Sequence, residues 1–276
     1  MDIKGKVVIV TGSSRSIGAA LAVELGRLGA RVVCSARSSS ARPGKAKGTV
    51  DETVAQIRAA GGDALAVAAD MGVEADVLRM VEATVAHYGR VDALVNNAAL
   101  TGNKTSLFGD MAAFDQEMAV NLRGPLVAMR EVARQVKKQG SEGRILNVTS
   151  SVGLNYLETL MAYGVSKLAL ERLTIDVAEQ LKADRIACNA FRIDMPVWNV
   201  GYEDPDSFGG VVADYAEPSV VAAEGMIWQL TRPVEYTGQL ESMQLLRKRE
   251  GIMPSRSRKP FSVDVLPHRG RLRLEW

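Results

Sequence analysis

The sequence predicts an α/β protein in which a single doubly wound parallel sheet is covered by helices on both faces. Apolar runs of strand length alternate with amphipathic segments of helix length along most of the 276 residues. Such alternation is typical of a parallel sheet, because each return to the same edge of the sheet needs a crossover helix. The strand-like runs are apolar throughout, which indicates strands that are buried on both faces.

The expected strands and helices follow one another along the chain. We expect strands at residues 7–11, 31–36, 64–69, 93–96, 144–148, 186–191 and 238–243. We expect helices at residues 17–28, 49–60, 74–88, 111–138, 161–182 and 220–231. Because no internal repeat or linker interrupts this order, residues 1–246 are predicted to form one domain.

Two segments depart from the alternation. Residues 194–218 form a long irregular stretch with four aromatic side chains, Trp198, Tyr202, Phe208 and Tyr215. Long ordered loops are often functional, so we expect a substrate loop here, and its side chains favour an apolar substrate. Residues 247–276 carry nine Lys or Arg against three Asp or Glu, with three prolines and no helical periodicity. We expect a basic, solvated C-terminal tail.

Composition argues against several classes of protein. No run of about 18 uncharged apolar residues occurs, so we expect no membrane span. The N-terminus lacks the pattern of a secretory signal, so the cytoplasm is the predicted location. The net charge is only +2, which makes nucleic-acid binding an unfavoured alternative that depends on the basic tail. Cys34 and Cys188 fall in apolar runs and are expected to be buried free thiols, and the two histidines are too isolated to indicate a metal site.

A glycine- and serine-rich turn follows the first expected strand. Its sequence runs Thr11-Gly12-Ser13-Ser14-Arg15-Ser16-Ile17-Gly18 and leads directly into the first helix. Small residues allow the backbone to approach a phosphate, and the N–H groups at the helix start attract its negative charge. The turn therefore predicts a Rossmann-type nucleotide site, although such a turn alone can be only a turn.

The end of the second strand bears on the choice of cofactor. An acidic residue here commonly binds the ribose 2′-hydroxyl of NAD, whereas an arginine suits the 2′-phosphate of NADP. The strand ends without a carboxylate, and Arg37 follows at once. Arg15 in the glycine turn faces the same region, and two guanidinium groups attract a phosphate dianion. We expect NADP(H) over NAD(H), the alternative being that Arg37 is an ordinary surface residue.

Tyr163 and Lys167 are four residues apart in an expected helix, so both side chains lie on one face. Free tyrosine has a pKa of about 10 and is a poor base at neutral pH. An ammonium about 4 Å away lowers such a pKa by about 3 units at an effective dielectric constant near 20. The pair is thus able to form a proton donor and acceptor, with Tyr163 as the general acid/base.

Polar side chains end two neighbouring strands. Ser150 follows the strand at 144–148, and Asn96 and Asn97 end the strand before it. Ligands of open α/β sheets bind beyond the carboxyl ends of the strands, where a hydroxyl can hydrogen-bond a substrate oxygen. Each of these residues alone is better explained as a helix cap or a turn residue, and only their convergence on one edge of the sheet indicates a site.

Together these residues resemble the short-chain dehydrogenase/reductase family over about residues 3–245. The matching motifs are the glycines Gly12 and Gly18, Asp70, Asn96-Asn97-Ala98, Asn121, Ser150 and Tyr163-x-x-x-Lys167. The thirteen-residue step from Ser150 to Tyr163 is the step usual in this family.

The resemblance implies roles for these residues. Tyr163 would exchange the proton with the substrate oxygen, Ser150 would orient the carbonyl, Lys167 would hold the nicotinamide ribose, and Asn121 would hold a proton-relaying water. The expected cofactor-binding set is Gly12, Ser14, Arg15, Ser16, Ile17, Gly18, Arg37, Asp70, Met71, Asn97, Ala98, Tyr163, Lys167 and Ile193. Members of the family are usually tetramers or dimers built on two long helices, here residues 111–138 and 161–182.

The chain departs from the family pattern at three places. Ser16 replaces a glycine of the phosphate-binding turn, and Ala99 replaces the last glycine of Asn-Asn-Ala-Gly. Residues 192–196, Arg-Ile-Asp-Met-Pro, stand where the family has Pro-Gly after the sixth strand. The expected function is an NADP-dependent oxidoreductase that acts on a carbonyl or secondary alcohol. The alternative is a non-catalytic dinucleotide-binding sensor or scaffold of the same fold.

Overall fold

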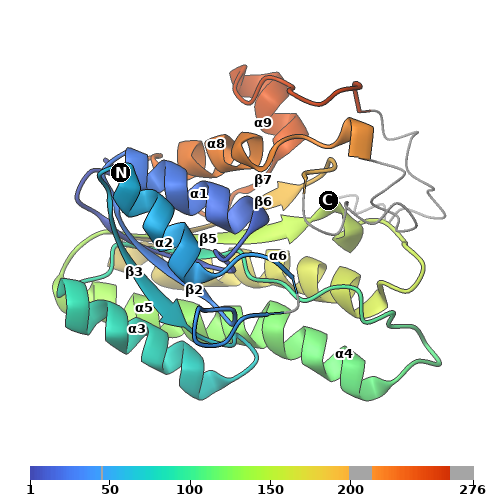
Figure 1. Cartoon of the computed structure of the whole chain (residues 1–276), viewed down its shortest axis with the longest axis horizontal. Helices are drawn as coiled ribbons and strands as arrows, with labels where there is room; N and C mark the ends of the chain where they lie inside the picture. Colours follow the sequence, from blue (N-terminus) through green and yellow to red (C-terminus); the bar gives the residue numbers. More distant parts are fainter. Residues whose placement is uncertain (45, 199–212, 262–276) are drawn as a thin grey trace.

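A computed structural model describes residues 1–44, 46–198 and 213–261, and its centre is a parallel sheet in the order β3-β2-β1-β4-β5-β6-β7 (Figure 1). The strands are β1 (Val7–Thr11), β2 (Arg31–Ala36), β3 (Asp63–Ala68), β4 (Ala93–Asn96), β5 (Gly143–Ser150), β6 (Ile186–Ile193) and β7 (Leu240–Ser242). All pairings are parallel, so the carboxyl ends of the strands share one edge. The strand order reverses between β1 and β4, which is where such sheets open a crevice for a ligand.

The helices cover both faces of the sheet. They are α1 (Ser16–Arg27), α2 (Val50–Ala59), α3 (Glu74–Tyr88), α4 (Met111–Met118), α5 (Gly124–Gln139), α6 (Met161–Leu181), α8 (Ser219–Leu230) and α9 (Met243–Glu250). In Figure 1, α1, α2 and α8 lie above the sheet and α3 and α5 below it. One buried apolar cluster joins the sheet to α1, α2 and α8, and a second joins it to α3, α5 and α6. The predicted doubly wound α/β fold is confirmed.

The helix expected at residues 111–138 is interrupted. A π-helical turn, Ala119–Arg123, separates α4 from α5 and contains the buried Asn121. Pro125 stands in the first turn of α5 and has no N–H to donate, which favours a break in the regular α-helical bonding at this point. The sequence predicted the length of this helical stretch but not the turn that aims Asn121 inward.

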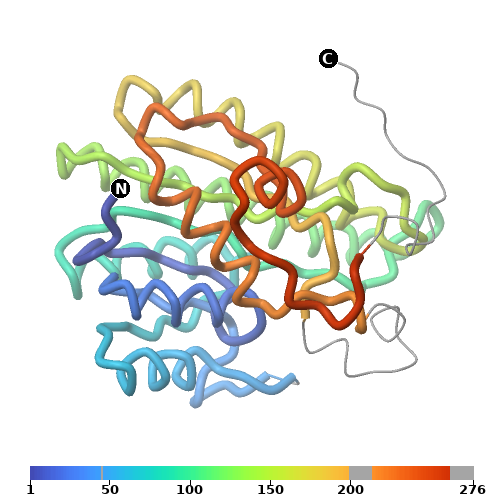
Figure 2. The backbone as a smooth tube through the Cα atoms, turned by 90° about the horizontal axis from the view of Figure 1, so that it is seen from above, coloured from blue at the N-terminus to red at the C-terminus, as the bar shows by residue number. Residues whose placement is uncertain are grey.

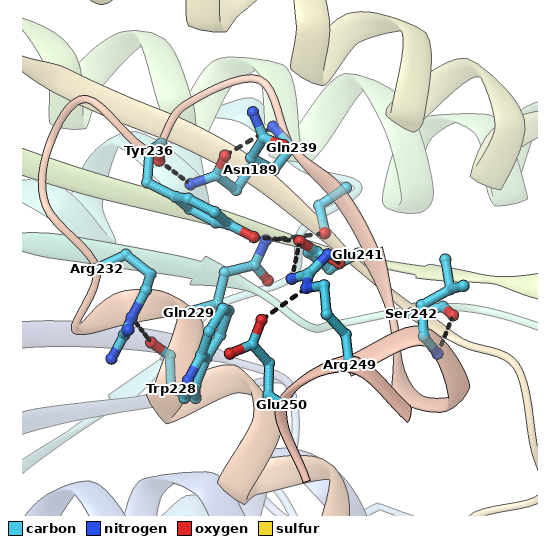
Figure 3. A network of polar contacts seen from close by, with 12 residues as sticks. Asn189, Trp228, Gln229, Arg232, Tyr236, Gln239, Glu241, Ser242, Arg249 and Glu250 are labelled. Carbon is cyan, nitrogen blue, oxygen red and sulfur yellow. Dashed lines mark hydrogen bonds and ion pairs between the residues drawn. The ribbon is translucent and has the colours of Figure 1, made fainter. Parts of the chain in front are cut away.

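The basic segment that was expected to be a solvated tail begins inside a helix. The predicted boundary after residue 246 falls within α9, which Ser242 caps by accepting a hydrogen bond from Leu245 N at 3.2 Å. Glu241 on β7, 4% exposed, binds Arg249 Nη2 at 2.7 Å and accepts a hydrogen bond from the Tyr236 hydroxyl (Figure 3). The prediction missed α9 because its charged residues hide the short apolar stripe that packs on the sheet edge.

The chain after α9 is anchored to the domain at several points as far as residue 261, although most of its residues are exposed. Met253 is 1% exposed and lies over Gly225 of α8. Glu217, also 1% exposed, accepts hydrogen bonds from Arg247 Nη2 at 2.8 Å, Ser255 Oγ at 2.7 Å and Arg256 N at 2.7 Å. Figure 2 shows this segment, in red, beside the orange chain that leads into α8. The helix and these contacts were not expected of the tail, although most of residues 251–261 are exposed to solvent, and residues 262–276 lie outside the described residues.

Two expectations from composition can be compared with the described chain. Cys34 and Cys188 are buried free thiols, as predicted. Among residues 1–44, 46–198 and 213–261, no helix combines the length and the apolar character that crossing a bilayer requires.

Candidate active site

A cleft of about 320 Å³ opens at the carboxyl ends of β1 to β4. Its lining residues are Gly12, Ser14, Arg15, Ser16, Ile17, Gly18, Ala36, Arg37, Ser38, Ala69, Asp70, Met71, Asn97, Ala98, Ala99 and Val120. Every residue of the expected cofactor set lies here except Tyr163, Lys167 and Ile193. The sequence reasoning missed neighbours of named residues, such as Ser38 after Arg37 and Val120 before Asn121, because neither belongs to a motif that the sequence marks.

The glycine turn has no room for larger residues at its two glycines. Gly12 has φ +68°, and a Cβ there would lie 2.7 Å from Ala98 Cα. A Cβ on Gly18 would lie 2.3 Å from the carbonyl oxygen of Gly12. The Asn97 amide donates to Thr11 O at 2.8 Å and to Gly12 O at 3.2 Å, so this side chain fixes the turn from the neighbouring strand.

Ser16 adopts φ +50°, a left-handed conformation that costs a non-glycine residue about 1–2 kcal/mol. The backbone at this position therefore keeps the conformation of a glycine although the side chain is larger. The departure from the family pattern leaves the course of the turn intact and adds a side chain to the lining of the cleft.

Two guanidinium groups stand at the edge of the cleft. Arg15 Nη2 donates to Ser38 Oγ at 3.0 Å and to Gly48 O at 3.4 Å, while its Nε is buried without a partner in the described structure. Burial lowers the pKa of Arg15, and the nearby charge of Arg37 lowers it further. Arg37 is 55% exposed, with Nη1 4.0 Å from Asp70 Oδ2. The Arg15 guanidinium, which keeps one donor without a partner, and the neighbouring charge of Arg37 together fit a phosphate group.

The four candidate catalytic residues come from three neighbouring elements. Ser150 ends β5, Tyr163 and Lys167 lie on α6, and Asn121 lies in the π-helical turn. Lys167 Nζ is 5.5 Å from the centroid of the Tyr163 ring and donates to Val148 O at 2.8 Å.

The Asn121 side chain is engaged by the protein. It accepts from Leu100 N at 2.7 Å and donates to Leu100 O at 2.8 Å and to Ser166 Oγ at 3.2 Å. Asn121 therefore ties the loop after β4 to α6.

The pKa of Tyr163 is raised in the structure, whereas the sequence analysis expected it to be lowered. Burial raises the pKa of Tyr163, a hydrogen bond with Ser150 lowers it, and the negative charge of Glu117 raises it, which leaves the pKa above its ordinary value. Burial also lowers the pKa of Lys167 to about 8. The expectation considered only the positive charge of Lys167. In the fold, burial disfavours the charged forms of both Tyr163 and Lys167, and the negative charge of Glu117 also raises the pKa of Tyr163.

The end of β6 is fixed by polar contacts where the family has Pro-Gly. Arg192 forms a bidentate ion pair with Glu171 of α6, at 2.8 and 2.7 Å, and Thr149 Oγ1 donates to the same carboxylate at 2.8 Å. Asp194 accepts from Gln244 N at the start of α9 at 3.1 Å. Ile193 pairs in register with Ser150, so it lies at the rim of the site although it does not line the cleft.

Only part of the expected substrate loop is described. Met195 is 6% exposed and Trp198 is 42% exposed, while Tyr202 and Phe208 lie outside the described residues. A second cavity of about 600 Å³ lies between residues 105–107 and 152–168. Neither Ser150 nor Tyr163 lines it, so it is not the cavity in which those two groups would meet a substrate.

Comparison with known proteins settles the family. A family model described as short chain dehydrogenase matches residues 6–195. The chain belongs to the short-chain dehydrogenase/reductase family. The chain is also 31% identical over 251 residues to hydroxysteroid dehydrogenase-like protein 2 of Xenopus tropicalis, covering 90% of this chain and 59% of the relative. It is 37% identical over 178 residues to an uncharacterized oxidoreductase of Thermotoga maritima, covering 64% of this chain and 66% of that protein.

Solved structures of this family share the fold. A metagenomic short-chain oxidoreductase in complex with NADP has a TM-score of 0.71 and 28% identity, covering 88% of this chain and 98% of its own. An acetoin dehydrogenase from Salmonella typhimurium has a TM-score of 0.75 and 26% identity, covering 87% and 94%. Sequence and fold therefore both place the chain in the short-chain dehydrogenase/reductase family, and the chain spans 59% of the length of the amphibian relative.

Proposed function

We propose that this short-chain dehydrogenase is an NADP(H)-dependent oxidoreductase that interconverts a carbonyl and a secondary alcohol, with Tyr163 as the general acid/base. The observation that carries the proposal is the meeting of Tyr163, Ser150 and Lys167 at the strand edge that also opens the nucleotide-sized cleft. A proton donor, a hydroxyl and an ammonium at one rim match what a developing alkoxide requires.

Each residue has a distinct task in this proposal. When bound, the cofactor supplies or accepts the hydride and its nicotinamide charge favours the phenolate. Tyr163 donates its phenol proton to the carbonyl oxygen during reduction and takes it back during oxidation. The Ser150 hydroxyl hydrogen-bonds both the phenol and the substrate oxygen. Lys167 uses one N–H on Val148 O, which leaves two donors for the nicotinamide ribose.

The preference for NADP(H) is supported by Arg15 and Arg37. Their charges lie close enough to disfavour one another, and a phosphate dianion between them relieves that repulsion. The NADP complex of a family member supports the same choice. Gly12, Ser14, Ile17 and Gly18 would hold the pyrophosphate, and Asp70, Met71, Asn97 and Ala98 would surround the adenosine, with Ile193 beside the nicotinamide.

The substrate class that we propose is an apolar ketone or secondary alcohol. Met195 and Trp198 begin the segment that follows β6, and the amphibian relative is named for a resemblance to hydroxysteroid dehydrogenases. A small-molecule screen tests both the reaction and the class. Reduction of aliphatic, cyclic and aromatic ketones is followed by the absorbance of NADPH, with the purified wild-type chain against a heat-denatured control. Turnover of apolar ketones supports the proposal, and no turnover of any ketone, aldehyde or secondary alcohol contradicts it.

A second candidate function is a dinucleotide-binding sensor or scaffold without catalysis. Ser16 favours it, because a side chain in the left-handed position crowds the phosphate approach. Ligand-induced stabilisation by NADPH without turnover in the same screen would support this alternative.

We also propose a homotetramer or homodimer that covers the outer faces of α4 and α6. Several large apolar side chains are exposed on these helices, namely Met111 on α4 and Met161, Val165 and Ile175 on α6. Light scattering after size-exclusion chromatography should give a multiple of the 29.7 kDa chain mass, and a monomer at micromolar concentration would contradict this assembly.

A further inference from the structure

Glu171 is a buried carboxylate at which three elements of the candidate site meet. It lies on α6 and is 4% exposed. Its Oε1 accepts one hydrogen bond from Thr149 Oγ1 on β5 at 2.8 Å and another from Arg192 Nε on β6 at 2.8 Å. Its Oε2 accepts a hydrogen bond from Arg192 Nη2 at 2.7 Å. One side chain of α6 is therefore bonded to the ends of two neighbouring strands.

The residues bonded to Glu171 adjoin the candidate site on both strands. Thr149 directly precedes Ser150, the last residue of β5. Arg192 directly precedes Ile193, the residue of β6 that pairs in register with Ser150. Successive residues of a strand are only about 3.3 Å apart along the strand. The bonds to Glu171 therefore hold the two strand ends directly beside the Ser150 hydroxyl.

Glu171 also lies on the face of α6 that carries Tyr163. Tyr163, Lys167 and Glu171 follow one another at four-residue steps, which places all three side chains on one face of the helix. Lys167 Nζ donates to Val148 O at 2.8 Å, one residue before Thr149. The helix is thus fastened to β5 at two successive residues, first through Lys167 and then through Glu171.

Stability alone does not explain an ion pair at this position. The side chains of Arg192 and Glu171 are 17% and 6% exposed, so both charges are largely withdrawn from water. Desolvation offsets most of their attraction, and apolar side chains of similar volume often stabilise a fold equally well. Apolar contacts lack direction, whereas three donors that converge on two oxygens fix the distances between α6, β5 and β6. The strand end also lacks the family's Pro-Gly, so no proline ring fixes the backbone from Arg192 to Asp194.

We propose that Glu171 is a positioning residue that aligns Ser150 on β5 with Tyr163 on α6 for proton transfer. The inference rests on the proposed acid/base role of Tyr163. Glu171 acts through the hydrogen bonds that it accepts from Thr149 and Arg192, which set the distance from α6 to the strand ends. Proton transfer needs the phenol, the hydroxyl and the substrate oxygen within hydrogen-bond reach, and a displacement of about 1 Å can slow a reaction about a hundredfold.

The test measures the single-turnover rate of ketone reduction, with a ketone from the screen above, well below the unfolding temperature of each variant. Thr149→Val removes the hydroxyl that joins β5 to the carboxylate and leaves the ion pair with Arg192, so the fold is retained. Its rate should fall about tenfold, while the NADPH dissociation constant stays within about threefold because neither Thr149 nor Glu171 lines the cleft. Glu171→Gln disturbs β6 as well, so its rate should fall at least as far. Thr149→Ser keeps the hydroxyl and should restore the rate, whereas a purely structural role would leave all these rates unchanged.

The matched control is Asp176→Asn, which removes the partner of Arg172 in an exposed ion pair on the same helix and should leave the rate unchanged. A folded Thr149→Val chain with the wild-type rate overturns the proposal, even where Glu171→Gln does not fold. Equal losses in Thr149→Val and Thr149→Ser also overturn it. A wild-type chain without turnover refutes the proposed function instead. Hydrogen–deuterium exchange at the ends of β5 and β6 then decides whether Glu171 holds them: faster exchange in Thr149→Val but not in Thr149→Ser supports this, and equal exchange refutes it.

Discussion

Replacing Arg37 by aspartate should shift the proposed cofactor preference away from NADPH and towards NADH. Arg37 is 55% exposed at the rim of the cleft and lies 4.0 Å from Asp70, so the variant loses only a long, weak ion pair within the protein. It gains a carboxylate where we propose the 2′-phosphate to bind. The same carboxylate can accept a hydrogen bond from the ribose 2′-hydroxyl of NADH.

The size of the effect follows from the exposure of the site. Two unit charges 4 Å apart interact by about 1 kcal/mol in water and about 4 kcal/mol at an effective dielectric constant near 20. For the half-exposed Arg37 we take about 2 kcal/mol of attraction, and the variant adds about 1 kcal/mol of repulsion from a shorter side chain. The sum of about 3 kcal/mol is a loss of about a hundredfold in NADPH affinity.

The assay is a fluorescence titration of NADPH and of NADH at low and at high salt. The NADH dissociation constant should change by less than about threefold, and the NADPH effect should shrink at high salt. Arg27→Asp is the control, because it makes the same charge change on an exposed side chain at the far end of α1. Equal weakening of both cofactors by Arg37→Asp would refute the 2′-phosphate argument.

Three other substitutions test separate parts of the structure. Ser16→Gly relieves about 1 kcal/mol of left-handed strain and clears the phosphate approach, so NADPH should bind several-fold tighter by titration; weaker binding would contradict the account. Burial lowers the pKa of Lys167 from 10.5 to about 8, which costs the fold about 3 kcal/mol at pH 7. Lys167→Met removes this cost but also the hydrogen bond to Val148 O, which is worth about 1 kcal/mol, so it should raise the free energy of unfolding by about 2 kcal/mol at pH 7. The gain should disappear as pH rises from 8 towards 10.5, where the unfolded chain also loses the proton, and a pH-independent difference in denaturant titrations would count against it. Burial raises the pKa of Glu217, but the hydrogen bonds from Arg256, Ser255 and Arg247 outweigh burial and leave the pKa below its ordinary value. The ionised carboxylate therefore stabilises the fold above about pH 4.3, and this stabilisation is lost as the pH falls further. Glu217→Gln should therefore lower the free energy of unfolding by about 2 kcal/mol at pH 7 and by less in acid. Equal stability of the two chains at pH 7 would contradict a stabilising role for the bonds that Glu217 accepts.

The sheet and the cleft were predictable because their signals are local. Apolar runs such as residues 7–11 and 93–96 matched β1 and β4 to the residue, and the glycine turn marked where the phosphate side of the cleft opens. The position of Arg15 within the glycine turn and of Arg37 directly after β2 was enough to predict that both cations lie at one edge of the cleft.

The polar partners of the candidate catalytic residues could not be predicted in this way. Glu117 accepts a hydrogen bond from Asn103 N across 14 positions of sequence, and Glu171 of α6 pairs with Arg192 of β6. Such contacts depend on how helices cross the sheet, which the period of apolar residues does not fix. The contacts of the segment after α9 were missed for the same reason, since its charges find acidic partners such as Glu224 and Asp214 only in the folded chain.

The central claim is that Tyr163 moves the proton while the neighbouring cleft holds the nucleotide, and Tyr163→Phe separates the two tasks. Tyr163 does not line the 320 Å³ cleft, so the account predicts an NADPH dissociation constant within about threefold of the wild type. Ketone reduction should fall by about a thousandfold or more, because general acid catalysis is lost. A phenylalanine variant that binds NADPH and reduces the ketone at the wild-type rate would contradict the account.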